Sequence, residues 1–198
     1  MIIGFDFDNT IINYSDSFKV LAKAKKLIPQ NFSSDKVSIR NYLRDKNLED
    51  KWTALQGEVY GKNIMRAGIY DGVLDTFEYL LKNKYKIKII SHKTKYPFIG
   101  KKINLRISAL KWIEKNLIKK ISKSDFSLSD IFFENTIERK IAKVQELKCD
   151  IFIDDLPEVL NLLPKRIKKI LFLPVPNINS NGTFIVMKSW REFNKIAI

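Results

Sequence analysis

The chain has 198 residues, a length that fits one ordinary domain with room for a small insertion. No run approaches the roughly 20 apolar residues that a membrane-spanning helix needs, and no basic stretch followed by an apolar signal core opens the chain. The single cysteine, Cys149, excludes an intramolecular disulfide and a thiolate metal site. We therefore expect a cytoplasmic protein without a membrane segment, in which Cys149 is a buried, unreactive thiol.

The chain is strongly basic, with a formal net charge of +14 from 36 Lys and Arg against 22 Asp and Glu. Such a field attracts phosphate groups, nucleic acids or acidic lipid surfaces without choosing among them. Compositional drift toward Lys, Ile and Asn would give a similar excess. However, residues 82–123 contain fourteen basic residues and one acid, a more local bias than drift favours. A phosphate-bearing partner fits this composition.

Short apolar runs alternate with longer amphipathic segments along most of the chain. Residues 1–5 are a continuous apolar run stopped by polar residues, which is typical of a strand buried on both faces of a parallel sheet. Further strands are expected at 87–90, 131–133, 151–153 and 170–173. Helices are expected at 73–82, 105–119, 137–144 and 156–163. The alternation predicts an α/β fold with a doubly wound parallel sheet.

Residues 14–70 interrupt this alternation. They contain no convincing buried strand but show helical stretches at 18–27, 34–43 and 48–60. We interpret them as a small inserted helical unit. The expected division is therefore a core formed by residues 1–13 and 71–198, with an inserted unit formed by 14–70.

Pairs of aspartates follow two of the expected strands. Asp6 and Asp8 stand two positions apart after the first strand, a spacing that aims both carboxylates to one side. Asp154 and Asp155 end the strand at 151–153. Ligands of open α/β sheets bind at the carboxyl ends of the strands, so both pairs are expected at one edge. The structural alternative is an Asp-rich turn for the first pair and a helix N-cap for the second.

This arrangement suits phosphoryl transfer. One carboxylate of the first pair can attack phosphorus, while the second protonates the leaving oxygen and then activates water. Phosphate and carboxylate repel each other unless a hard, oxygen-ligated cation such as Mg²⁺ lies between them. Ser91 ends the strand at 87–90 in a hydroxyl, and Lys140, or Lys143 one turn later, can neutralise phosphoryl charge.

These segments resemble the four ordered motifs of the haloacid dehalogenase (HAD) superfamily, whose members are mostly phosphatases on a Rossmann-like core. The matching residues are Asp6-Phe7-Asp8-Asn9-Thr10, Ser91, Lys140 and Asp154-Asp155. The resemblance implies that Asp6 is the nucleophile and a metal ligand. It implies that Asp8 is the general acid and base, with its backbone carbonyl on Mg²⁺. Asp8 also favours phosphate-ester hydrolysis, because dehalogenases and ion-pumping ATPases of the superfamily lack an aspartate there.

The resemblance also implies roles for the remaining motif residues. Ser91 would hydrogen-bond the phosphoryl group, and Lys140 would steady Asp6 and phosphate. The usual spacing of the superfamily favours Lys140 over Lys143. Asp154 and Asp155 would complete the Mg²⁺ shell, directly or through water, and which of them contacts the ion stays open. The inserted unit resembles the helical cap that many members close over the site.

Substrate identity does not follow from the resemblance. The candidate substrate contacts are Asn9, His92, Trp52 and Gln56. We expect a magnesium-dependent phosphatase for a small phosphorylated metabolite, either a sugar phosphate or a nucleotide. Two alternatives are a nucleic-acid end phosphatase that uses the basic stretch 82–123, and a basic binding protein that keeps the fold without turnover. The chain carries no signal of its oligomeric state.

Overall fold

The structure is a computed structural model that describes residues 1–32, 35–122, 125–174 and 183–196 of the chain. Ser34 and Lys123, which belong to two of the stretches considered above, lie outside these residues. The chain divides into two compact units. Unit 1 comprises Met1–Ile12, Ile69–Lys93 and Glu114–Ile198, and unit 2 comprises Asn13–Gly68 and Thr94–Ile113.

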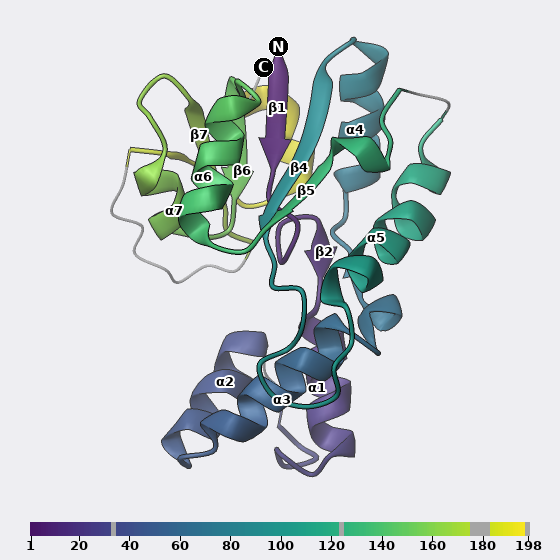
Figure 1. Ribbon diagram of the computed structural model, residues 1–198, viewed down its shortest axis with the longest axis vertical. Helices are drawn as coiled ribbons and strands as arrows, with labels where there is room; N and C mark the ends of the chain where they lie inside the picture. Colours follow the sequence, from purple (N-terminus) through teal and green to yellow (C-terminus); the bar gives the residue numbers. More distant parts are fainter. Residues whose placement is uncertain (33–34, 123–124, 175–182, 197–198) are drawn as a thin grey trace. The chain divides into compact units, whose positions relative to one another are not determined.

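Unit 1 contains a parallel sheet that has six strands within the described residues, in the order β5-β4-β1-β6-β7-β8 (Figure 1). Every neighbouring pair of these strands is parallel. The sheet grows outward from β1 in both directions, which confirms the predicted doubly wound α/β class. The strands are β1 (Ile2–Phe5), β4 (Lys86–His92), β5 (Ile131–Glu134), β6 (Ile151–Asp154), β7 (Lys168–Phe172) and β8 (Ile185–Met187).

Helices of unit 1 cover both faces of this sheet. In Figure 1, α6 (Ile137–Glu146) and α7 (Pro157–Leu162) lie over its near face. They bury an aliphatic cluster that includes Val144, Leu160 and Leu171. On the other face, α4 (Val73–Lys82) and α8 (Phe193–Ile196) contribute to an aromatic cluster. There the ring of Phe5 lies 5.0 Å from Phe77, 5.6 Å from Trp190 and 6.1 Å from Phe193.

The period of two along β1 sends Gly4 and Phe5 to opposite faces of the sheet. A methyl group on Gly4 would lie 2.6 Å from the ring of Phe152 and 3.0 Å from the sulfur of Cys149. Gly4 therefore provides the space in which these two side chains pack. Cys149 is fully buried, as predicted.

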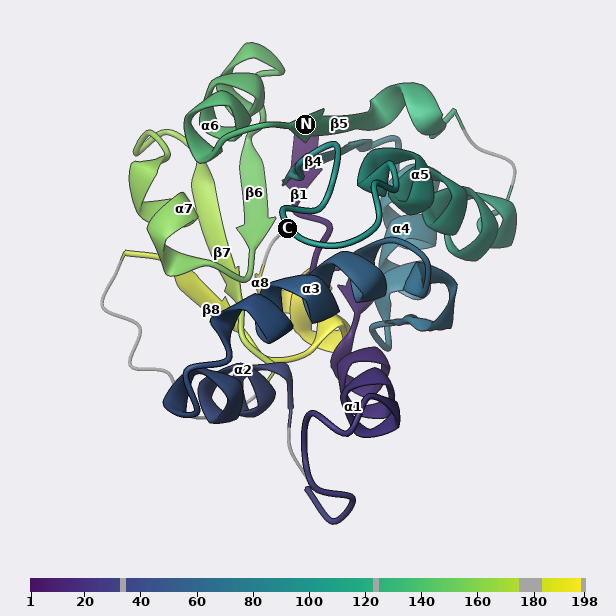
Figure 2. The same ribbon diagram turned by 60° about the horizontal axis from the view of Figure 1, so that its bottom comes forward.

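Unit 2 is largely helical. Its helices α1 (Ser15–Ala24), α2 (Lys36–Asp45) and α3 (Glu49–Tyr60) pack against one another (Figure 2). The unit also contains α5 (Leu105–Asn116) as far as Ile113. Two short strands, β2 (Ile12–Asn13) and β3 (Gly68–Ile69), pair where the chain passes from one unit to the other. Short 3₁₀ helices lie at Ile64–Arg66, Ile118–Lys120, Leu128–Asp130 and Trp190–Glu192.

The elements that the sequence predicts lie close to their observed positions. The sequence pattern does not predict the short strands β2, β3 and β8 or the short helix α8. In addition, residues 94–113 group with unit 2, whereas the expected division placed all of 71–198 in the core. No helix of the described residues is long and apolar enough to cross a membrane.

Candidate active site

The carboxyl ends of β1 and β6 bring two buried aspartates together in unit 1. Phe5 pairs with Ile153, and the Asp6 N–H donates a 2.8 Å hydrogen bond to the Ile153 carbonyl. This register places Asp6 beside Asp154. Asp6 is 4% exposed and Asp154 is fully buried. Two carboxylates at this depth need partners that neutralise them.

Lys140 of α6 is the cation that joins these two aspartates. Its Nζ lies 2.5 Å from Asp6 Oδ1 and 2.6 Å from Asp154 Oδ2, and the side chain is almost fully buried. Thr136 begins the helix by accepting a hydrogen bond from the Arg139 N–H. Lys140 thereby stands one turn inside the helix. Lys143, the alternative considered above, instead pairs with Glu146 at 2.6 Å.

Burial changes the pKa values of all three groups. It raises the pKa of Asp6 to about 7, because the lowering effect of Lys140 is outweighed by burial together with the charges of Asp154 and Asp8. Burial also raises the pKa of Asp154, against Lys140. Burial lowers the pKa of Lys140, but attraction by Asp154 and Asp6 outweighs it, and the net shift is upward. One ammonium thus leaves negative charge uncompensated in the site.

Three carboxylates of the site can converge on a metal ion. One oxygen each from Asp6, Asp154 and Asp155 lies within 4.8 Å of the others. An all-carboxylate set is the oxygen chemistry that Mg²⁺ prefers, and a divalent cation would offset the remaining negative charge. The residues present therefore fit a hard divalent cation. The carboxylate of Asp8 is not part of this group.

Asp8 is held by a lysine that the sequence analysis missed. Lys93 Nζ lies 3.0 Å from Asp8 Oδ1 and 2.7 Å from Asp8 Oδ2. Lys93 is 4% exposed, although it directly follows the last residue of β4. One signal could have identified it: Lys93 stands two residues after Ser91, just as Asp8 stands two residues after Asp6.

The other expected residues of unit 1 also lie at the carboxyl ends of the strands. Ser91 is buried near the end of β4, where it pairs with Phe133 of β5. His92 is exposed, and its Nε2 lies 3.0 Å from the carbonyl oxygen of Asn135. Asn9 is half-buried and adopts the left-handed conformation, with φ of 58°, in the turn after Asp8.

The two substrate contacts expected in the insertion belong to unit 2. Trp52 is 2% exposed, and its ring stacks on Phe18 at 5.1 Å. Trp52 is therefore a core residue of unit 2, so the sequence prediction that its ring contacts a ligand is not supported. Gln56, one turn further along α3, is half-buried. Trp112 and Trp190 are also buried.

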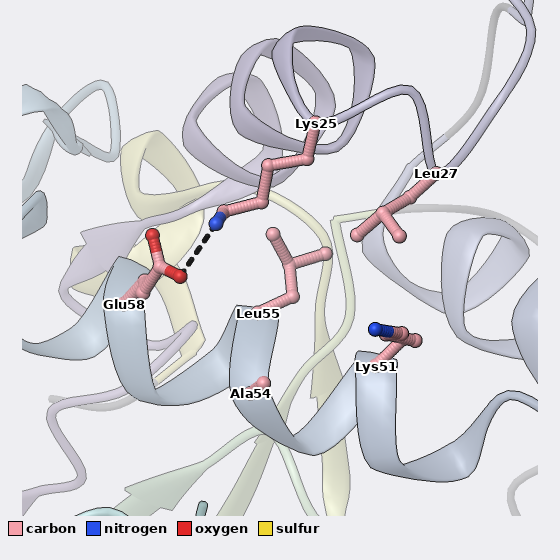
Figure 3. Close-up of a pocket in the computed structure, with 6 residues that line it drawn as sticks. All are labelled: Lys25, Leu27, Lys51, Ala54, Leu55 and Glu58. Carbon is pink, nitrogen blue, oxygen red and sulfur yellow. Dashed lines mark ion pairs between the residues drawn. The ribbon is translucent and has the colours of Figure 1, made fainter. Parts of the chain in front are cut away.

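Unit 2 also contains a pocket of about 290 Å³ (Figure 3). In Figure 3, Lys25 and Glu58 point toward each other across it, and their charged atoms lie 2.6 Å apart. None of the expected site residues lines this pocket. Its lining residues are Lys25, Leu27, Lys51, Ala54, Leu55 and Glu58.

Solved structures share this fold over the whole chain. A HAD phosphatase from Thermococcus onnurineus has a TM-score of 0.58 and 13% identity, covering 98% of this chain and 96% of its own. A HAD hydrolase of family IA, variant 3, from Entamoeba histolytica has a TM-score of 0.57 and 15% identity, covering 100% and 95%. The sequence matches no protein-family model and no curated protein. The chain therefore has the fold of the HAD superfamily, as the motif resemblance predicts.

A third neighbour is a Bacillus subtilis protein described as a HAD hydrolase and solved with magnesium bound. Its TM-score is 0.54 at 13% identity, with coverage of 100% of this chain and 98% of its own. Identities of this size establish a shared fold. The reaction has to be argued from the residues of the site.

Proposed function

We propose that the chain is a Mg²⁺-dependent phosphatase that hydrolyses the phosphate monoester of a small metabolite, a sugar phosphate or a nucleotide. The observation that carries this proposal is the pairing of Lys140 with Asp6 and Asp154 at the carboxyl ends of adjacent strands. It combines a nucleophile, a charge-neutralising cation and a metal carboxylate in one buried cluster. The single buried cysteine fits the cytoplasmic location that we also propose.

In the first half-reaction, a carboxylate oxygen of Asp6 attacks phosphorus. The new Asp6–phosphorus bond forms as the ester bond breaks, and Asp8 gives a proton to the departing oxygen. Lys140 supplies positive charge beside the attacking carboxylate. The Ser91 hydroxyl is suited to donate a hydrogen bond to a phosphoryl oxygen.

In the second half-reaction, water hydrolyses the aspartyl phosphate. Asp8, now ionised, accepts a proton from the water that attacks phosphorus, and the bond to Asp6 breaks as inorganic phosphate leaves. The proton that Asp8 gave up is thereby replaced, the phosphoryl group leaves as inorganic phosphate, and both aspartates return to their starting states. Asp8 acts as acid and then as base, as its place two residues after the nucleophile allows.

Asp6, Asp154 and Asp155 are the carboxylates that would hold Mg²⁺, together with the backbone carbonyl of Asp8. When bound, the ion lowers the repulsion between the Asp6 carboxylate and an incoming phosphate and orients both. We propose that unit 2 acts as the cap that selects the substrate. Within this proposal, Asn9, His92 and Gln56 are the residues that contact the substrate.

Release of inorganic phosphate tests this proposal. We expect turnover of an aryl phosphate and of some members of a panel of sugar phosphates and nucleotides in Mg²⁺, and loss of turnover with a chelator. Asp6→Asn should abolish turnover, whereas the matched Asp75→Asn change at an exposed aspartate of α4 should leave it unchanged. A panel of 5′- and 3′-phosphorylated oligonucleotides distinguishes a phosphatase for small metabolites from a nucleic-acid end phosphatase. Equal turnover by wild type and Asp6→Asn would contradict the proposal.

A further inference from the structure

Lys93 is a buried cation that the reaction described above does not use. Within the described residues, Lys93 and Lys140 are the two lysines with buried side chains. Lys140 is paired with Asp6 and Asp154, and Lys93 is paired with Asp8 through both carboxylate oxygens. Each aspartate of the Asp6–Asp8 segment therefore has its own buried ammonium.

The backbone around this ion pair is fixed independently of it. The N–H groups of Ile11 and Ile12 both donate to the Phe7 carbonyl at 3.1 Å, which closes the turn that follows Asp8. On the other side, the Lys93 N–H donates a 2.9 Å hydrogen bond to the Glu134 carbonyl and extends the pairing of β4 with β5. The remaining freedom of Asp8 lies in its side-chain torsions.

Two contacts from one ammonium to both oxygens of Asp8 restrict those torsions. Asp8 is 19% exposed in its side chain, whereas Lys93 is 2% exposed in its own. The ammonium also lies 5.6 Å from the centre of the Phe7 ring, against which it is packed. Burying a lysine costs solvation and side-chain entropy, and the attraction within a buried ion pair often does not exceed that cost. A contribution to the stability of the fold is therefore a weak explanation for a buried lysine at this position.

We propose that Lys93 is a positioning residue that holds the Asp8 carboxylate in the orientation from which it transfers protons. This inference rests on the proposed function and adds a residue to it. Displacement of a catalytic group by about 1 Å can cost roughly a hundredfold in rate. Loss of Lys93 should therefore impair the steps in which Asp8 moves a proton, with less effect on attack by Asp6.

The chemistry gives this role a specific signature. A nitrophenolate leaves readily without a proton, whereas an alkoxide leaves slowly unless an acid protonates it. Variants of a residue that positions the acid should lose activity on alkyl phosphates much more than on nitrophenyl phosphate. A residue that only stabilises the fold, or only binds the phosphate group, should affect both substrates alike.

The test measures kcat and KM on p-nitrophenyl phosphate and on the best alkyl phosphate for the wild type, Lys93→Met, Asp8→Asn and the double variant. We expect Lys93→Met to lower kcat/KM, which covers the steps up to departure of the leaving group, by about a hundredfold on the alkyl phosphate but by less than about tenfold on p-nitrophenyl phosphate. Hydrolysis of the aspartyl phosphate is common to both substrates and affects kcat alike for both. In the Asp8→Asn background, Lys93→Met should cause no further loss, because both changes remove the same function. Lys95→Met, at an exposed lysine two residues later, is the matched control and should leave kcat unchanged.

Thermal unfolding of each variant accompanies the kinetics. Lys93→Arg keeps the charge with a different geometry, so it serves if Lys93→Met does not fold. The expected result for Lys93→Arg is the same leaving-group signature with a smaller loss. Equal losses of kcat/KM on both substrates, a further loss when Lys93→Met is added to Asp8→Asn, or kinetics like those of the wild type would each contradict this role of Lys93. If Asp6→Asn is inactive while Lys93→Met is fully active, this inference alone fails. If Asp6→Asn retains turnover, the proposed function fails with it.

Discussion

The ammonium of Lys140 lies between two carboxylates that would otherwise repel each other in a site shielded from water. At this range in the protein interior, electrostatic interactions are several times stronger than at the surface. Removing one partner of such a buried cluster leaves the others uncompensated. We therefore expect Lys140 to stabilise this buried cluster as well as to take part in the proposed reaction.

Replacing each of the two lysines of α6 separately by methionine distinguishes their roles. We expect Lys140→Met to lower kcat by at least about a hundredfold, because phosphoryl charge then lacks its neighbouring cation. Lys143→Met should retain activity within about twofold, since Lys143 pairs with exposed Glu146 and its loss costs only a surface ion pair. Phosphate release measures both variants. Comparable losses in the two would contradict the assignment of Lys140.

The thiol of Cys149 should be inert in the folded protein. Burial raises its pKa to about 12, so the thiolate that reacts with alkylating reagents is a very small fraction at pH 8. We expect iodoacetamide to modify Cys149 slowly in the native protein and rapidly in denaturant, as followed by mass spectrometry. Rapid native labelling would show that this part of the core opens.

At the residue scale, the order of polar strand ends was sufficient to predict that Asp6 and Asp154 meet, whereas Lys140, on a helix, was chosen over Lys143 from the resemblance to the superfamily. Parallel strands bring their carboxyl ends to one edge, whatever the intervening sequence. Lys93 was not predicted, and only its place two residues after Ser91 could have identified it. It lies among many basic residues between 82 and 123, and composition does not distinguish the one that is buried. Trp52 packs in the core of unit 2, and a helical sequence pattern does not distinguish an aromatic residue that packs from one that contacts a ligand.

At the element scale, the apolar runs located β1, β4, β5, β6 and β7 because central parallel strands are buried on both faces. The edge strand β8 has three residues, two of them exposed, and therefore leaves no such run. The predicted range of α5 does not fix which of its faces packs. Ile107 is exposed, whereas Ala109 and Trp112 are buried. The apolar residues of that helix are compatible with more than one packed face.

The contact between α3 and the segment that follows β4 can be tested through Gly57. A methyl group there would lie 2.7 Å from Pro97 Cβ and 3.1 Å from the Ile99 carbonyl oxygen. Replacing a helical glycine by alanine normally stabilises by up to about 1 kcal/mol. Here we expect Gly57→Ala to destabilise the protein by about 1–3 kcal/mol, because backbone must move.

Thermal unfolding measures this effect, and Gly68→Ala is the matched control. Nothing lies within 4 Å of a methyl group on Gly68, so its replacement should change stability by less than about 0.5 kcal/mol. A higher melting temperature for Gly57→Ala than for the wild type would show that residues 97–99 do not pack on α3.

At the scale of the whole molecule, a metal site should couple to folding, because an ion that binds only the native state raises its stability. We expect Mg²⁺ to raise the melting temperature of the wild type but not of Asp154→Asn. The pKa of Asp6 is raised to about 7, so protons compete with the ion as the pH falls through that value. The Mg²⁺-induced shift should therefore be larger at pH 8 than at pH 6. A shift independent of Asp154 would place the ion elsewhere.

The most direct test of the central claim is to locate the phosphoryl group on the enzyme. Asp8→Asn protein, mixed with nitrophenyl phosphate and Mg²⁺ and quenched in acid, should accumulate the aspartyl phosphate, because the base that activates water is missing. Mass spectrometry should then find a phosphoryl group on the peptide that contains Asp6, and no such adduct in the Asp6→Asn, Asp8→Asn double variant. Turnover by the wild type with no phosphoryl group on Asp6, or with the group on another residue, would contradict this account.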